Sequence, residues 1–495
     1  METSAGKKRS SFWLPRAAWL LFFLLAVAMP LSLARWLMES SHQKAVTLTK
    51  SRGKIPKTSA GKGVAVSSAQ KESAASCGIP AAELPLIGIY VGNDSEAREE
   101  LEKQIDEVVN LMRSLEGASG IDCKVDGVLS FRAVLAKMGV RVPETMTDAD
   151  AAAEFLRLSQ RYSALLSQWR EAVGKDSWDF SGLESKDTYT TGFKIFRMAA
   201  TLQRLLGVVT EARLQTGDTE GAWSELRTMN SSTVRNGDLR LFSPEIFTLR
   251  PQMMETAQAG MRLGVWTDAQ LIEISTMLGE ANALASVQRQ LQGEKLWIAD
   301  FLTRFRENKS EIQGDFSGSK SSIDQIINWI GITTATDQQM ADNLAVIEYK
   351  MDQLFTRFHP DTGFYLGESP DDEIQLPRSK PSDLSFDKFY YMYSEMYGGR
   401  HDWVPEAIIR SQSNIDQTRI AAALEMQRRV TGQYPETLDT LGGSIPRDIA
   451  TGQPYLYKRN ADGGYTLWGT GIDGKSDGGD QHADVIWIQK SGKAK

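Results

Sequence analysis

Residues 191–226 read TGFKIFRMAATLQRLLGVVTEARLQTGDTEGAWSEL, and this stretch sets the architecture expected for most of the chain. Apolar residues recur every three or four positions from Thr191 to Gln215, which is the spacing of an amphipathic helix. Gly217 ends the pattern, and Asp218 is placed to cap a second helix that carries Ala222, Trp223 and Leu226. So short a link predicts two antiparallel helices packed side by side.

The same helical period appears on both sides of this pair. Capping-box patterns occur at Asn93/Glu96 and at Thr267/Gln270, and Ser243-Pro244-Glu245 is another helix start. Further helices are expected near 281–307 and 321–357. Two more apolar stripes are Leu101, Ile105, Val108, Met112 and Leu115, and Phe155, Leu158, Tyr162, Leu165 and Trp169. The sequence therefore predicts a mainly α protein with a multi-helix body over residues 81–410, and a helical-repeat solenoid is the alternative arrangement.

Residues 1–38 are predicted to be a membrane-targeting segment. Four basic residues precede an uncharged 18-residue run, AAWLLFFLLAVAMPLSLA, from Ala17 to Ala34. One interpretation is a signal-anchor transmembrane helix with Trp13 and Trp36 at the two interfaces. The other is a cleaved signal peptide with Ser32-Leu33-Ala34 as its cleavage site. In the first case, which we favour, the protein is a single-pass inner-membrane protein with its body in the periplasm; an inverted anchor would leave the body facing the cytoplasm.

Residues 39–80 are predicted to be a flexible basic linker, since they are rich in Ser, Ala, Lys and Gly and contain no acidic residue between Glu39 and Glu72. The first 71 residues carry a charge of +10 and the remainder −17, within a net charge of −7. An acidic body argues against nucleic acid as a partner. The chain has two cysteines, Cys77 and Cys123, which an oxidising compartment would allow to pair, and four histidines.

The segment 359–403 has a different composition from the helical body. It contains four prolines, followed by the aromatic residues Phe386, Phe389, Tyr390, Tyr391, Tyr393, Tyr397 and Trp403. Aromatic side chains bind sugars or peptides, but they also fill cores and seams between domains. A sugar-binding role for this segment would fit an envelope hydrolase or binding protein acting on polysaccharide.

The C-terminal segment, residues 411–495, carries the most specific pattern. A helix is expected from Asn414 to Gly432, and a hairpin with strands at Tyr455–Arg459 and Tyr465–Gly469. Three short motifs follow the helix: Gly432-Gln433-Tyr434-Pro435, Ile445-Pro446-Arg447-Asp448 and Gly452-Gln453-Pro454-Tyr455-Leu456-Tyr457. An acidic, glycine-rich loop follows the hairpin and contains Gly471-Ile472-Asp473-Gly474, Asp477-Gly478-Gly479-Asp480 and Ala483-Asp484-Val485-Ile486.

These motifs resemble the C-terminal domain of the major pseudopilin of type II secretion systems. The resemblance implies a small α+β domain with an antiparallel sheet, and it covers about residues 414–488. The region from Gly217 to Lys295 is more loosely similar to large uncharacterised exported proteins of planctomycete and verrucomicrobial type.

In the pseudopilin family the acidic loop binds calcium, a cation that takes six to eight oxygen ligands. The resemblance places Asp473 and Asp484 as carboxylate ligands. The family's remaining aspartate is His482 here, and Asp480 or Asp477 would have to supply the missing oxygen. An Asp/Gly-rich turn without metal is the alternative interpretation.

Two further observations bear on function. The apolar run lacks the preceding glycine and the internal glutamate of a pseudopilin leader site, so the chain is not expected to polymerise as a pilin. No nucleophile elbow, HExxH zinc motif or phosphate-binding loop is present, so no enzyme activity is predicted. The sequence favours a membrane-tethered, exported binding or scaffold protein of the cell envelope, associated with secretion or pilus-like machinery.

Overall fold

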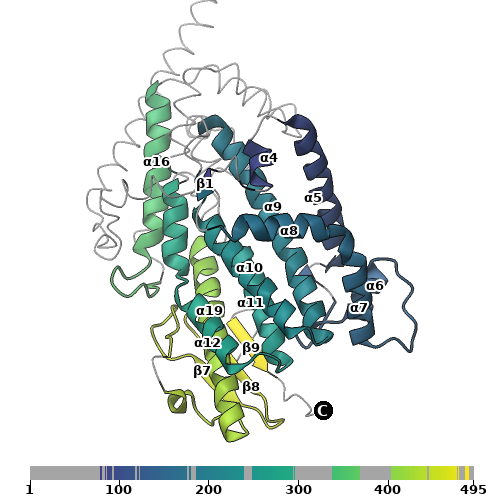
Figure 1. The fold of residues 1–495 in the computed structure, drawn as a ribbon. Coiled ribbons are helices and arrows are strands. Elements are labelled where there is room, and N and C mark those ends of the chain that lie inside the picture. Colours follow the sequence, from purple (N-terminus) through teal and green to yellow (C-terminus); the bar gives the residue numbers. More distant parts are fainter. Residues whose placement is uncertain are drawn as a thin grey trace, which may run out of the picture. The chain divides into compact units, whose positions relative to one another are not determined.

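A computed structural model gives the fold of the chain (Figure 1). It describes residues 79–80, 84, 86–91, 94–117, 120–121, 123–175, 178–179, 185–238, 248–293, 295, 337–367, 403–442, 445–476, 478 and 485–489. The chain divides into two compact units. One consists of Lys57–Phe301, Met351–Asp372 and His401–Lys495, and the other of Met1–Pro56, Leu302–Lys350 and Glu373–Arg400.

The helix pair expected from residues 191–226 is confirmed. Helix α9 (Ser185–Gln215) packs along α10 (Thr219–Asp238). The link turns at Gly217, whose φ is +82°, and the Asp218 carboxylate caps α10 by accepting a hydrogen bond from Gly221 N at 3.0 Å. Helix α9 also contacts α4 (Ile87–Val91), so it lies at the centre of the body.

Helix α5 (Ser95–Leu115) buries the predicted apolar stripe against α9. Its first turn is capped by Asp94, which accepts a hydrogen bond from Ala97 N at 2.9 Å; the expected cap, Asn93, lies outside the described residues. Helix α6 (Phe131–Lys137) packs on α7 (Asp148–Ser159).

The second predicted stripe is buried except for Leu158, which is half-buried, and it is divided between two helices. Helix α7 ends at Ser159, and a 3₁₀ turn over Gln160–Tyr162 leads into α8 (Ser163–Val173). The stripe keeps its three- and four-residue spacing across the turn, because a short 3₁₀ turn changes the helical phase only a little.

Two more helices complete the body next to α9 and α10. Helix α11 (Leu249–Arg262) packs against both, and α12 (Asp268–Gly279) follows it. The capping box predicted for α12 is present, since Thr267 N donates to Gln270 Oε1 at 2.8 Å and Gln270 N donates to Thr267 Oγ1 at 3.3 Å. A further helix spans 283–293, and α16 spans Asp337–Thr356. The helix start expected at 243–245 lies outside the described residues.

The C-terminal sheet is antiparallel, as expected, and has the strand order β7-β8-β9. Its strands are β7 (Leu456–Arg459), β8 (Tyr465–Gly469) and β9 (Val485–Gln489), with Tyr465 opposite Arg459 on one side and Gln489 on the other. Short two-residue pairs occur elsewhere: parallel β1 (Ile79–Pro80) with β6 (Trp178–Asp179), antiparallel β2 (Glu116–Gly117) with β3 (Gly120–Ile121), and antiparallel β4 (Lys124–Val125) with β5 (Val128–Leu129).

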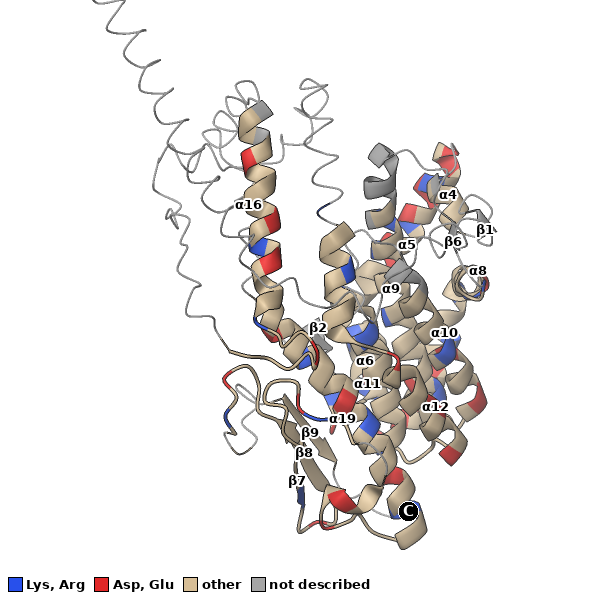
Figure 2. Cartoon of the chain, turned by 90° about the vertical axis from the view of Figure 1, so that its left-hand side faces the viewer, with Lys and Arg blue, Asp and Glu red and all other residues tan. Residues whose placement is uncertain are grey.

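Helix α19 (Val404–Thr431) joins this sheet to the helical body. It contacts β8 and β9 on one side and α11 and α12 on the other (Figure 2). The helix begins ten residues before the expected Asn414 and ends at Gly432, as predicted. The expected domain boundary at 410/411 therefore falls inside α19.

Several predicted segments lie outside the described residues: the apolar segment 17–34, the linker up to residue 78 with Cys77, and residues 368–402 of the aromatic segment. The last two residues of the predicted linker, Ile79 and Pro80, form β1. Within the described part of the chain, no helix has the length and apolar character needed to span a bilayer. Cys123 is buried.

Candidate functional site

The expected calcium ligands belong to the loop between β8 and β9. Asp473 is described: it is exposed, and its Oδ1 accepts a hydrogen bond from Lys475 N at 3.0 Å, which closes a local turn. Asp477, Asp480 and Asp484 lie outside the described residues, as does His482. Among the residues that the structure does describe, no three His, Cys, Asp or Glu side chains are grouped closely enough to hold a metal. The calcium site therefore stays a prediction.

The base of this loop is held by the buried carboxylate of Asp448. Its Oδ2 accepts hydrogen bonds from both the backbone N and the hydroxyl of Thr470, each at 2.9 Å, and its Oδ1 accepts one from Ala450 N at 3.0 Å. Gly469 makes this approach feasible, because a Cβ there would lie 3.0 Å from the Tyr455 ring and 3.3 Å from Asp448 Oδ2. Asp448 thereby fixes the point at which the loop leaves β8.

A second buried carboxylate, Asp416, lies on α19 beneath the same segment. Gln412 Nε2 donates to its Oδ1 and Tyr455 Oη donates to its Oδ2, both at 3.1 Å, and an Arg419 nitrogen lies 3.8 Å from Oδ1. Burial raises the pKa of Asp416 to about 6, and the hydrogen bonds oppose this rise only in part. Burial also raises the pKa of Tyr455 well above its ordinary value.

Polar contacts from α19 to the neighbouring helices fix its position. Gln412 Oε1 accepts a hydrogen bond from Ala283 N at 3.0 Å, Gln258 Nε2 donates to Thr418 Oγ1 at 2.9 Å, and Arg429 pairs with Asp268 at 2.8 Å. On the sheet side, Gln417 Nε2 donates to Val485 O at 2.7 Å. Asp416 therefore lies in the region where α19 contacts both the helical body and the C-terminal sheet.

A separate buried carboxylate, Glu211, lies where the β4–β5 hairpin crosses α9. The hairpin turns at Asp126 and Gly127, with φ of +53° and +78°, and Leu129 N donates to Glu211 Oε2 at 2.9 Å. Burial raises the pKa of Glu211 to about 7, although Lys124 lowers it through its charge. Lys124 itself pairs with Glu255 on α11 at 2.5 Å.

Arg262, at the end of α11, links this hairpin to the sheet. Its guanidinium donates to Gly127 O at 3.3 Å, and its central carbon lies 5.0 Å from the ring of Trp487 on β9. A cation over an indole face is attracted by the negative potential of the ring. This contact between Arg262 and Trp487 was not predicted from the sequence, because a single arginine and a single tryptophan 225 positions apart give no local pattern.

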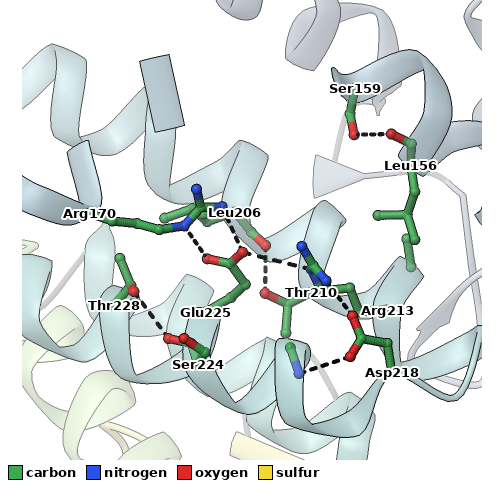
Figure 3. A network of polar contacts seen from close by, with 12 residues as sticks. Leu156, Ser159, Arg170, Leu206, Thr210, Arg213, Asp218, Ser224, Glu225 and Thr228 are labelled. Carbon is green, nitrogen blue, oxygen red and sulfur yellow. Dashed lines mark hydrogen bonds and ion pairs between the residues drawn. The ribbon is translucent and has the colours of Figure 1, made fainter. Parts of the chain in front are cut away.

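An ion-pair network centred on the buried carboxylate of Glu225 lies between α8, α9 and α10 (Figure 3). Arg170 makes two hydrogen bonds to the Glu225 carboxylate, at 2.9 and 2.6 Å. Arg213 lies 3.7 Å from the same carboxylate and also pairs with Asp218, the cap of α10. Each charge already has a partner within the network, so we assign the network a structural role. It holds α8, α9 and α10 in their relative positions.

One small cavity of about 60 Å³ lies between α4, α5 and α9. It is lined by Tyr90, Glu102, Ile105, Lys194, Arg197 and Met198. The charges on its wall are paired, Lys194 with Glu102 at 2.7 Å and Arg197 with Asp106. Burial raises the pKa of Tyr90 to about 12, and the nearby Glu102 carboxylate adds to this rise.

Comparisons with protein-family models, with curated proteins and with solved structures each return no match.

Proposed function

We propose that this chain is a membrane-tethered, exported scaffold or binding protein of the cell envelope, with a calcium-binding loop over residues 470–484. The apolar run from Ala17 to Ala34 supports the tether. The pseudopilin-like motifs of residues 432–486 support the calcium loop and an association with secretion or pilus-like machinery. That association rests on resemblance, since fold alone does not give function.

The observation that carries the scaffold role is the double packing of α19. The helix is covered by α11 and α12 on one side and by β8 and β9 on the other. Buried hydrogen bonds extend from it in both directions, from Gln258 to Thr418 and from Gln417 to Val485. An α+β unit fixed in this way presents its loops from a rigid base, which suits a docking role.

The calcium part of the proposal is tested by thermal unfolding of the full chain in detergent. Millimolar calcium should raise the Tm relative to EDTA, because a ligand that binds only the folded state stabilises it. Asp484→Ala should abolish the rise. Asp439→Asn, an exposed aspartate on the 3₁₀ turn Leu438–Leu441, is the matched control and should keep it. An equal Tm in calcium and EDTA for the wild-type chain would refute the calcium loop.

The tether is tested separately by a topology reporter. Alkaline phosphatase joined after Lys495 folds only outside the cytoplasm. We expect high phosphatase activity in the membrane fraction of cells producing the fusion. Activity in the soluble periplasmic fraction would identify a cleaved signal peptide, and an inactive fusion would place the body on the cytoplasmic side.

A further inference from the structure

The small cavity between α4, α5 and α9 has an apolar floor, formed by Ile105 of α5 and Met198 of α9, which are both buried. Glu102 lies three positions before Ile105, and Lys194 lies four positions before Met198. Each helix therefore presents apolar and charged residues on the face that lines the cavity. The volume of about 60 Å³ has room for about four water molecules, and so for a ligand no larger than a small amino acid.

Charged side chains form the mouth of this cavity. Lys194 pairs with Glu102 at 2.7 Å, and Arg197 pairs with Asp106, so each ion pair joins α9 to α5. The four side chains are between 38% and 57% exposed, and exposed ion pairs contribute little to stability. A ligand can therefore replace one partner of a pair at small cost. Because two positive and two negative charges balance, the mouth favours a ligand that carries one charge of each sign.

Tyr90 of α4 adds a buried hydroxyl to the wall of the cavity. The residue is only 5% exposed, and its backbone oxygen accepts a hydrogen bond from Arg98 Nη2 at 3.2 Å, which holds the end of α4 in place. Among the residues that the structure describes, none forms a hydrogen bond with the Tyr90 hydroxyl. Since a buried phenol hydroxyl ordinarily has a partner, this group is available to a ligand in the cavity.

We propose that this cavity binds a small α-amino acid with a free ammonium and a free carboxylate group, such as alanine. The ammonium group lies beside Glu102. The carboxylate lies against Arg197 and accepts a hydrogen bond from the Tyr90 hydroxyl. The methyl group packs on the apolar floor. The inference concerns the helical body, so it does not depend on the proposed calcium loop or on the membrane tether.

Equilibrium dialysis of the full chain in detergent and EDTA against radiolabelled DL-alanine tests the proposal. We expect saturable binding with a Kd below about 10 mM. Unlabelled glycine should compete. Propionate lacks the ammonium group, ethylamine lacks the carboxylate, and tryptophan is too large for the cavity, so none of these three should compete. A lack of saturable alanine binding, or competition by propionate or ethylamine as strong as that by glycine, would overturn the proposal.

Two variants and two matched controls connect the binding to this cavity. Arg197→Gln and Glu102→Gln each remove one charge from the mouth and should weaken alanine binding about tenfold, the effect of one charge-assisted hydrogen bond. Arg227 and Glu273 form a similarly exposed ion pair at 2.7 Å between α10 and α12. Arg227→Gln and Glu273→Gln should therefore leave the Kd within about twofold of wild type.

The two sets of variants separate a site from a general effect of surface charge. All four residues are at least a third exposed, so each variant should fold. Equal weakening in the control variants, or an unchanged Kd in both Arg197→Gln and Glu102→Gln, would show that alanine does not bind between α4, α5 and α9.

Discussion

The side-chain amide of Gln417 donates a hydrogen bond of 2.7 Å to the backbone carbonyl of Val485, and both residues are buried. This single bond ties the middle of α19 to the first residue of the edge strand β9. Val485 is also paired with Gly469 of the neighbouring strand β8, so the glutamine fastens to the helix a residue that the sheet already holds.

Removing this bond should weaken the attachment of the sheet. Gln417→Ala removes this buried hydrogen bond, so the free energy of unfolding should fall by at least about 1 kcal/mol. Urea denaturation of the full chain measures the change. Gln427→Ala, at a half-buried glutamine further along α19, should stay within about 0.5 kcal/mol of wild type. A similar loss in both variants would mean that helix propensity, and not the bond to β9, sets the effect.

Gly260 is predicted to tolerate no side chain. It lies in α11, and a Cβ there would come within 2.2 Å of the indole of Trp266. This ring is fully buried, and its Nε1 donates to Ala257 O at 2.8 Å, so it has little freedom to move. Gly260→Ala should therefore destabilise the protein by at least about 1–3 kcal/mol despite the higher helix propensity of alanine.

Gly279→Ala is the control for that variant. Its Cβ would make only ordinary contacts, 3.6 Å or more from the Arg419 guanidinium. We expect it to be neutral in the same unfolding measurement. If Gly260→Ala is neutral as well, the close packing of Trp266 on α11 is wrong.

The pH dependence of stability should reflect Glu211. Its folded pKa, about 7, lies above the value of 4.5 expected for an unfolded glutamate. The folded state therefore binds more protons between these values, and stability falls as the pH rises from about 4.5 to 7. A shift of this size corresponds to at most about 3.5 kcal/mol.

Glu211→Gln removes this titration. Urea unfolding between pH 5 and pH 8 should show a shallower decline for the variant than for wild type, and the remaining slope should come from Asp416. Glu255→Gln, which alters an exposed carboxylate of the same cluster, should change the slope little. A wild-type slope that persists in Glu211→Gln would show that Glu211 ionises freely in the folded state.

The Arg170–Glu225 pair should show strong coupling. Arg170→Met leaves a buried carboxylate with only Arg213, 3.7 Å away, to compensate it. Breaking a buried pair typically costs about 3–5 kcal/mol, and the partial exposure of Arg170 and the presence of Arg213 should reduce this to about 2–3 kcal/mol.

Replacing both partners should recover much of that loss. Arg170→Met/Glu225→Leu is expected to be more stable than Arg170→Met alone, because no unpaired charge remains. A double-mutant cycle by urea denaturation gives the coupling energy. Additive losses in the cycle would show that the two side chains do not interact.

Features governed by neighbouring residues could be predicted from the sequence. The turn at Gly217 and Asp218, the capping box at Thr267 and the hairpin before Tyr465 each depend on a few consecutive side chains, and the structure confirms all three. The beginning of α19 was missed. Its first turn has no polar cap, since Trp403 precedes Val404 and Pro405, so the usual start signal is absent.

The two buried carboxylates with a raised pKa, Asp416 and Glu211, could not have been identified in advance. Asp416 lies among buried residues of α19, and Glu211 follows Thr210 on the buried side of α9, but either could equally have faced solvent. Burial of one acid depends on which helix or loop covers it. Asp416 is covered by Tyr455 and Glu211 by Leu129, and in each case the two residues are distant in sequence.

The double packing of α19 also has a consequence for the order of folding. Helices α11 and α12 are synthesised well over a hundred residues before the helix that covers them. Until α19 has been made, the apolar surface that it will bury stays open to water and to other chains. Because this part of the core cannot be completed until α19 has been made, we expect the nascent chain to be a client for a holding chaperone.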